Sequence, residues 1–246
     1  MTDNRFVAAP KTLEAPGDYF GRSRQPLTML LVLLPVIAIV EFGLGGASSS
    51  DAQQVLANVQ LREVVRLFAI SPVVVVHALG VIVLLVLITW HALDQRPWKI
   101  RPADIPLMLL EGCIASVPLL VAAAALLSTS HLPLTAPEVE TFTLPQAILV
   151  ACTAALSEEF IFRMCGIALG HLILVDLLRL KDGIGLTVSV IATAAAFTLY
   201  HDPAGLGPLP VTFYAVAGLY LGGLFVARGF APAVLAHAIY NVIALS

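Results

Sequence analysis

Seven apolar segments, each near the length that crosses a lipid bilayer, dominate this sequence. A helix needs about 20 apolar residues to cross the hydrocarbon core of a bilayer. The segments cover residues 27–46, 69–91, 105–127, 144–176, 184–203, 208–227 and 230–246. The sequence therefore predicts an all-α fold, a polytopic transmembrane helical bundle of about seven spans.

Composition and charge agree with a membrane location. Hydrophobic residues make up 59% of the 246 residues and charged residues 12%, whereas soluble domains average about 45–50% and about 25%. The net charge is −3, and no basic run is long enough to indicate a nucleic-acid partner. We therefore expect an integral membrane protein surrounded by the lipid bilayer.

Residues 51–68 differ from the seven apolar segments. Charged residues interrupt their apolar ones, a pattern typical of an amphipathic helix at the membrane interface. An irregular eighth span is the alternative interpretation of this segment.

Basic residues predict the orientation of the chain. Lys and Arg lie in residues 1–26, in the loop 92–104, after the fourth span and before the last. The alternate loops lack them, apart from two arginines within residues 51–68. Because short cytoplasmic loops are enriched in Lys and Arg, residues 1–26 are expected to form a cytoplasmic N-terminal segment. The alanine- and leucine-rich composition points to a bacterial inner membrane.

The fourth span contains the densest group of ionisable residues, Glu158, Glu159 and Arg163. Such residues are costly in the hydrocarbon region and indicate a functional site by default. Glu159 and Arg163 are four residues apart, so they share a helix face and can pair. Glu158 points about 100° away around the helix, which leaves it free to act as a general base. The alternative is that the group marks a helix end at the membrane interface.

Two later spans carry further polar residues. Phe197 and His201 share a face near the end of the fifth span, and His237 and Asn241 share a face in the last. Taken singly, His201 fits a satisfied helix-end residue, and the His237–Asn241 pair fits a bridge between spans. Taken together with Glu158, they predict one polar pocket inside the membrane with the parts of a hydrolytic site.

Two kinds of chemistry suit this pocket. A carboxylate beside a histidine can activate water, while a second histidine and an amide can donate hydrogen bonds to an oxyanion. Glu158, His201 and His237 have instead the donor types of a catalytic zinc site with one open position. The residues alone do not choose between a metal-free site and a zinc site.

The three motifs resemble those of the CPBP intramembrane proteases, which include CAAX prenyl endopeptidases and bacteriocin-processing or immunity proteins. The family pattern Glu-Glu-x-x-x-Arg, Phe-x-x-x-His and His-x-x-x-Asn stands here in the same order. Gly218 and Gly222 resemble the family's glycine-rich helix, where small residues permit close packing. The resemblance implies a catalytic transmembrane core at residues 144–246, preceded by N-terminal transmembrane helices at residues 27–143.

The resemblance also implies roles for seven residues. Glu158 is expected to activate water with His201 as its partner, and His237 and Asn241 are expected to stabilise the oxyanion. The supporting residues are Glu159, Arg163 and Phe197. We favour a metal-free glutamate mechanism with no cofactor, and zinc held by Glu158, His201 and His237 is the alternative.

The predicted function is intramembrane proteolysis. The partner is a peptide or protein substrate in the membrane, cleaved near its C-terminus, as in CAAX-like processing or removal of a sorting tail. A non-catalytic bacteriocin-immunity or scaffold protein of the same family is the second hypothesis. A proton-relaying transporter is the third, but it predicts two related halves, and no internal repeat is evident.

The predicted topology raises a difficulty of depth. Glu158 lies 14 residues after the start of its span and His201 lies 17 residues after the start of its own, on the opposite side. At 1.5 Å per residue, these positions are about 21 Å below one face and about 26 Å above the other. The two side chains can meet only if the fourth span enters the bilayer late, or is tilted or kinked.

Overall fold

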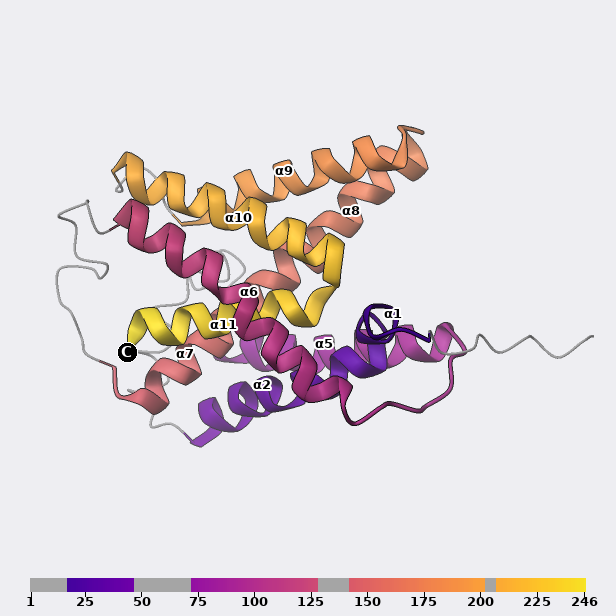
Figure 1. Cartoon of the computed structure of the whole chain (residues 1–246), viewed down its shortest axis with the longest axis horizontal. Helices are drawn as coiled ribbons and strands as arrows, with labels where there is room; N and C mark the ends of the chain where they lie inside the picture. Colours follow the sequence, from indigo (N-terminus) through magenta and orange to yellow (C-terminus); the bar gives the residue numbers. More distant parts are fainter. Residues whose placement is uncertain (1–16, 47–71, 128–141, 202–206) are drawn as a thin grey trace, which may run out of the picture.

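The computed structural model describes residues 17–46, 72–127, 142–201 and 207–246, and these residues form helices and no strands. The helices are α1 (Tyr19–Ser23), α2 (Pro26–Gly46), α5 (Pro72–Leu93), α6 (Asp104–Leu127), α7 (Leu144–Glu158), α8 (Ala168–His171), α9 (Asp182–Tyr200), α10 (Pro208–Arg228) and α11 (Phe230–Leu245). Figure 1 shows their arrangement. The all-α prediction is confirmed for these residues, whereas residues 51–68 lie outside them.

Five helical elements are long and apolar enough to cross a membrane. They are Pro26–Gly43, Asp104–Leu126, Leu144–Leu177, Asp182–Tyr200 and Pro208–Arg228. The other two predicted spans form apolar helices too, but their qualifying stretches, His77–Leu93 and Phe230–Leu245, are shorter. The predicted count of about seven spans is therefore not confirmed, although each predicted segment is helical where the structure describes it.

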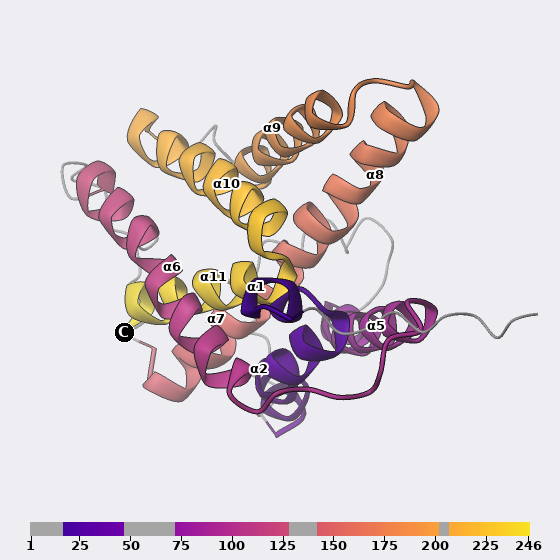
Figure 2. The same cartoon turned by 45° about the vertical axis from the view of Figure 1, so that its right-hand side comes forward.

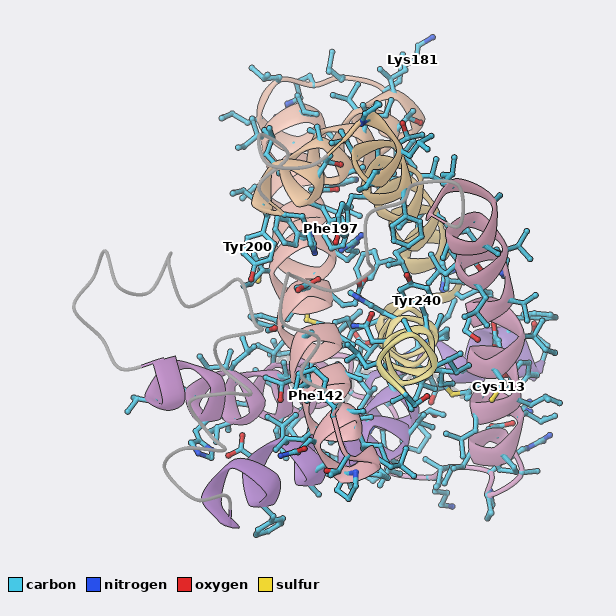
Figure 3. All side chains as sticks on the ribbon, turned by 90° about the vertical axis from the view of Figure 1, so that its left-hand side faces the viewer. Cys113, Phe142, Lys181, Phe197, Tyr200 and Tyr240 are labelled. Atoms are coloured by element: carbon cyan, nitrogen blue, oxygen red, sulfur yellow. The ribbon has the colours of Figure 1, made fainter. Side chains whose placement is uncertain are left out.

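Helix α11 is short, and its first nine residues are buried inside the protein. Its 16 residues extend about 24 Å, less than the roughly 30 Å of a bilayer core. It packs against α2, α6, α7 and α10, and Figure 3, which looks along it, shows it between α7 and α6. Residues 230–238 are all buried, as expected for a helix that is apolar on every side.

The fourth predicted span is one continuous helical element with two π-helical stretches. These are η1 (Glu159–Ile167), which follows α7 directly, and η2 (Leu172–Leu177), which follows α8. Helix α9 then turns back and packs along η1, α8 and η2, as Figure 2 shows. This hairpin determines which residues of the fourth and fifth spans lie at the same level.

Glycines bring α9 and α10 close together, as the sequence predicted. A Cβ atom added to Gly218 would lie 3.0 Å from the Cα atom of Ala194. One added to Gly222 would lie 3.0 Å from a methyl carbon of Val190. Both distances are shorter than ordinary van der Waals contacts. Gly218 meets backbone, which cannot easily move, whereas Gly222 meets a side chain.

Two apolar clusters form the core. The larger lies among α2, α5, α7 and α11, and the smaller lies among α6, α10 and α11. Each cluster combines helices that precede residue 143 with helices that follow it. The polar residues described next lie where η1, α9, α10 and α11 meet.

Candidate active site

Glu158 lies at the junction between α7 and η1, as the last residue of α7. Its side chain is buried, with 4% of the residue exposed. The Oε2 atom lies 3.8 Å from Nε2 of His201 and 3.8 Å from Nε2 of His237. Three residues from three predicted spans therefore converge on one point, as the sequence predicted.

The hairpin explains how Glu158 and His201 reach the same level. Glu158 lies 19 residues before the end of η2 at Leu177, and His201 lies 19 residues after the start of α9 at Asp182. Both are therefore about equally far from the turn that joins the two elements. In Figure 3 this turn is marked by Lys181, and Phe197, one helical turn before His201, lies between it and Phe142 near the start of α7. The difficulty of depth disappears because the fourth element is 34 residues long.

The ring of His201 is fixed by its neighbours. Its Nδ1–H donates a hydrogen bond of 2.8 Å to the carbonyl oxygen of Phe197. Because a carbonyl oxygen can only accept, the hydrogen of the neutral ring must be on Nδ1. The ring also stacks on Tyr214 of α10, with centroids 4.1 Å apart and planes 20° apart. The Nε2 atom, which then carries the lone pair, faces Glu158.

Glu159 makes two buried contacts through its Oε1 atom. This atom lies 3.1 Å from an Nη atom of Arg163, which is the predicted pair, and 2.8 Å from Nδ1 of His237. The His237 Nδ1–H donates to the carboxylate, so its Nε2 also carries the lone pair in the neutral ring. Glu159 therefore orients one of the two imidazoles that face Glu158.

Arg163 is buried, and its guanidinium contacts a carbonyl oxygen and an aromatic ring. It donates to the carbonyl oxygen of Gly218 at 3.4 Å. Its guanidinium also lies over the ring of Phe197, 4.4 Å from the centroid. These contacts lie just after the α→π junction, and π-helical turns often occur at functional sites. The adjacent Glu158 and Glu159 share His237, which faces Glu158 through Nε2 and Glu159 through Nδ1, but Arg163 pairs with Glu159 and His201 faces Glu158.

Asn241 is less closely involved than the sequence predicted. It lies on α11 one turn after His237 and is partly buried. It makes no hydrogen bond to another described residue. Its assignment to the oxyanion therefore stays a prediction.

Sequence reasoning missed two contacts in this cluster. The Glu159–His237 hydrogen bond depends on how α11 is rotated relative to η1, which no local pattern records. The stacking of Tyr214 on His201 also joins two elements, and Tyr214 belongs to none of the motifs. The sequence contained a signal for the Glu159–His237 hydrogen bond only, because polar groups buried in neighbouring spans need hydrogen-bond partners.

The cluster has the donor types of a zinc site but not its spacing. Glu158, His201 and His237 supply the donor types that zinc takes in catalytic sites. Tetrahedral ligands about 2.0–2.1 Å from zinc lie about 3.3 Å from one another, whereas the carboxylate here lies 3.8 Å from each Nε2. Among the described residues, no group of three or more His, Cys, Asp or Glu has a spacing that could hold a metal ion. The site in this conformation is not preformed for zinc.

The arrangement can transfer protons. The Glu158 Oε2 atom is buried and has no hydrogen-bond partner among the described residues. It faces two imidazole nitrogens that carry lone pairs when neutral and donate when protonated. One carboxylate and two oriented histidines can take a proton from water and return it to a leaving group.

One protein-family model matches the part of the chain that contains this cluster. Residues 140–243 match a family model described as type II CAAX prenyl endopeptidase Rce1-like. The matched region contains every residue of the cluster, from Glu158 on α7 to His237 on α11. No curated protein and no solved structure shows significant similarity to the chain. The match over residues 140–243 supports the resemblance to CAAX prenyl endopeptidases that the three motifs indicated.

Proposed function

We propose that this protein is an intramembrane endopeptidase that uses Glu158 to activate water. The observation that carries the proposal is the convergence of two imidazole Nε2 atoms on the buried Glu158 Oε2, each at 3.8 Å. Neither imidazole is free to rotate, because each Nδ1–H is held by a hydrogen bond. Orientation of this kind lowers the barrier of proton-transfer steps.

The first step is attack by water on the scissile carbonyl. Glu158, with His201 beside it, accepts a proton as the water oxygen bonds to the carbonyl carbon. The carbonyl oxygen becomes an oxyanion, which needs hydrogen-bond donors directed at its position. Protonated His237 supplies one donor through Nε2–H, and Asn241, one turn further along α11, is proposed as the second.

The second step is departure of the amine. The carbon–nitrogen bond breaks, the carbonyl re-forms, and the nitrogen takes up the proton removed from water. Glu158 or His201 returns that proton, so the site ends each cycle in its starting state. Atoms and charge balance without a further reactant.

The charges of the cluster suit this cycle. Ionised Glu158 and Glu159 carry two negative charges, and Arg163 carries one positive charge. A buried net charge is costly, so one proton shared among Glu158, His201 and His237 makes the group neutral.

The proposed substrate is a membrane-associated peptide cleaved near its C-terminus, in CAAX-like processing or removal of a sorting tail. Support comes from the family match and from the position of the site within long apolar helices. A bacterial inner membrane and a cytoplasmic N-terminus are proposed with it, on the distribution of Lys and Arg.

The experiment is cleavage of a prenylated CAAX-type peptide and of a membrane-anchored sorting-tail peptide by the full chain in liposomes. Glu158→Gln and His201→Ala should each lower kcat by about 10²–10⁴-fold, as expected for loss of general acid–base catalysis. The matched control is Glu41→Gln, which removes a second membrane-embedded carboxylate, one that pairs with His77 at 2.7 Å outside the site. Wild-type rates in both site variants would refute the proposal and favour an immunity or scaffold role.

The same assay tests the metal-free mechanism. We expect chelators such as EDTA and phenanthroline to leave kcat unchanged, because the three donors are spaced too widely for zinc in this conformation. Loss of activity on chelation, with recovery on adding zinc, would show that the site contracts around a metal ion instead.

A further inference from the structure

A second polar feature lies apart from the proposed active site. It is a cavity of about 320 Å³ beside α1, where α2 and α6 begin. Figure 2 shows α1 next to the beginnings of these two helices. The lining residues are Gly17, Arg22, Gln25, Thr28, Lys99, Ile100, Arg101 and Asp104. None of them belongs to the catalytic cluster.

The wall of this cavity is positively charged. It contains three cations, Arg22, Lys99 and Arg101, and one carboxylate, Asp104. That carboxylate is already engaged, because Arg22 donates two hydrogen bonds of 2.8 Å to its two oxygens. The side chains of Lys99 and Arg101 are exposed, so their charge is available to a ligand.

Two helix N-termini add to the positive potential. Helix α2 has 21 residues and begins at Pro26, directly after Gln25, and helix α6 has 24 residues and begins at Asp104. The helix dipole places partial positive charge at each of these two ends, which favours an anion. The N–H groups of Asp104 and Ile105 at the start of α6 are already used, because they donate to the carbonyl oxygens of Arg101 and Pro102.

Gln25 provides an independent indication of a ligand. Only 4% of this residue is exposed. Its buried side-chain nitrogen has no hydrogen-bond partner among the described residues, although the residue lines the cavity. A buried donor without a partner is costly, and an acceptor bound in the cavity would remove that cost.

We propose that this cavity binds a phosphate group. A phosphate offers several acceptor oxygens and negative charge, which match the Gln25 amide, the positive ends of the two helix dipoles and the side chains of Lys99 and Arg101. The group can come from a phospholipid headgroup or from free phosphate. The proposal does not depend on proteolytic activity.

The test is calorimetric titration of the full chain in a non-ionic detergent with three probes. They are inorganic phosphate, short-chain phosphatidylglycerol, and short-chain diacylglycerol as a lipid without phosphate. Saturable binding of phosphatidylglycerol but not of diacylglycerol would identify a headgroup site. Saturable binding of inorganic phosphate alone would identify a free-phosphate site.

Variants decide whether the cavity is responsible. Lys99→Ala with Arg101→Ala should weaken binding by about tenfold or more, because each basic residue contributes to attraction of an anionic headgroup. The matched control is Arg179→Ala with Lys181→Ala, which removes the same charge from exposed residues of the turn before α9. The near-isosteric Gln25→Met tests the buried donor and should also weaken binding.

Two results would overturn the proposal. One is the absence of saturable binding of both phosphate-bearing probes by the wild-type chain. The other is an equal loss of affinity in the two double variants, which would mean that general surface charge attracts the anion. Thermal unfolding of each variant without probe separates loss of binding from loss of folding.

Discussion

Phe197 connects the side chains on which the proposed chemistry depends. Its carbonyl oxygen accepts from His201 Nδ1–H, and its ring centroid lies 4.5 Å from that of His201 and 6.2 Å from that of His237. Arg163 lies over the same ring, a contact worth about 2 kcal/mol when desolvated. One aromatic residue thus positions both imidazoles relative to the Glu159–Arg163 pair.

Glu159 should act as a positioning residue. Glu159→Gln removes the negative charge that stabilises protonated His237, so kcat should fall by about 10–100-fold, as for partners that orient catalytic ligands. KM should stay unchanged because Glu159 is fully buried behind His237. Steady-state kinetics on the peptide assay measures both constants. A rise in KM with an unchanged kcat would contradict this role.

Arg163 should matter for stability more than for chemistry. Arg163→Ala leaves Glu159 as a buried carboxylate without its cation, which should cost about 3–5 kcal/mol. The double variant Arg163→Met with Glu159→Gln removes both charges and should recover most of that loss. Thermal unfolding in detergent compares the variants. If Arg163→Ala unfolds like the wild type, the pair is not structurally important.

At the scale of helices, the site depends on how closely α9 and α10 approach. His201 follows the end of α9, and its stacking partner Tyr214 lies on α10. The glycines of α10 permit that approach, since Gly218 faces the backbone of Ala194 without a side chain between them. Packing between two helices therefore positions the His201 ring, which neither helix orients alone.

Two glycines of the same helix provide a matched test. Gly218→Ala should destabilise the fold by about 1–3 kcal/mol, because the new Cβ would press on the Ala194 backbone. Gly223→Ala should be neutral or slightly stabilising, because nothing lies within 4 Å of its added Cβ and Ala favours helix. Thermal unfolding measures both, and equal effects would show that close packing is not the reason for Gly218.

Local geometry explains what the sequence could predict. The Glu159–Arg163 pair follows from their spacing of four residues within one helical element, and the helical segments follow from runs of apolar residues. The Glu159–His237 bond and the Tyr214 stacking join separate helices, so they depend on rotations that no short pattern contains. The count of about seven spans is not confirmed, because the qualifying apolar stretches of α5 and α11 are shorter than the other five.

At the scale of the whole molecule, α1 is tied to helices far along the chain. Arg228 at the end of α10 pairs with Glu111 of α6 and donates to Ser23 at 2.9 Å. Tyr19 donates to the same glutamate at 2.6 Å. This network holds the start of the described chain against α6 and α10. Glu111 therefore has the structural role of a charge paired within the protein.

Tyr19 gives the network a pH dependence. Burial, together with the hydrogen bond to Glu111, raises the pKa of Tyr19 above its ordinary value of 10.0. A group whose pKa is raised on folding stabilises the protein fully below the unfolded pKa and loses that contribution as the pH rises. Tyr19→Phe should cost about 1 kcal/mol below pH 10, and the difference from wild type should shrink above it. Unfolding measured across pH 8–11 checks this, and a difference independent of pH would contradict it.

The equal distances of Glu158 and His201 from their shared turn restrict how this hairpin can change length. An insertion on one arm alone, between Glu158 and Leu177 or between Asp182 and His201, would move one of these two side chains away from the level of the other. A compensating insertion of similar rise on the other arm would restore the alignment. Residues 178–181 are exempt from this requirement, so natural length variation in relatives should concentrate there.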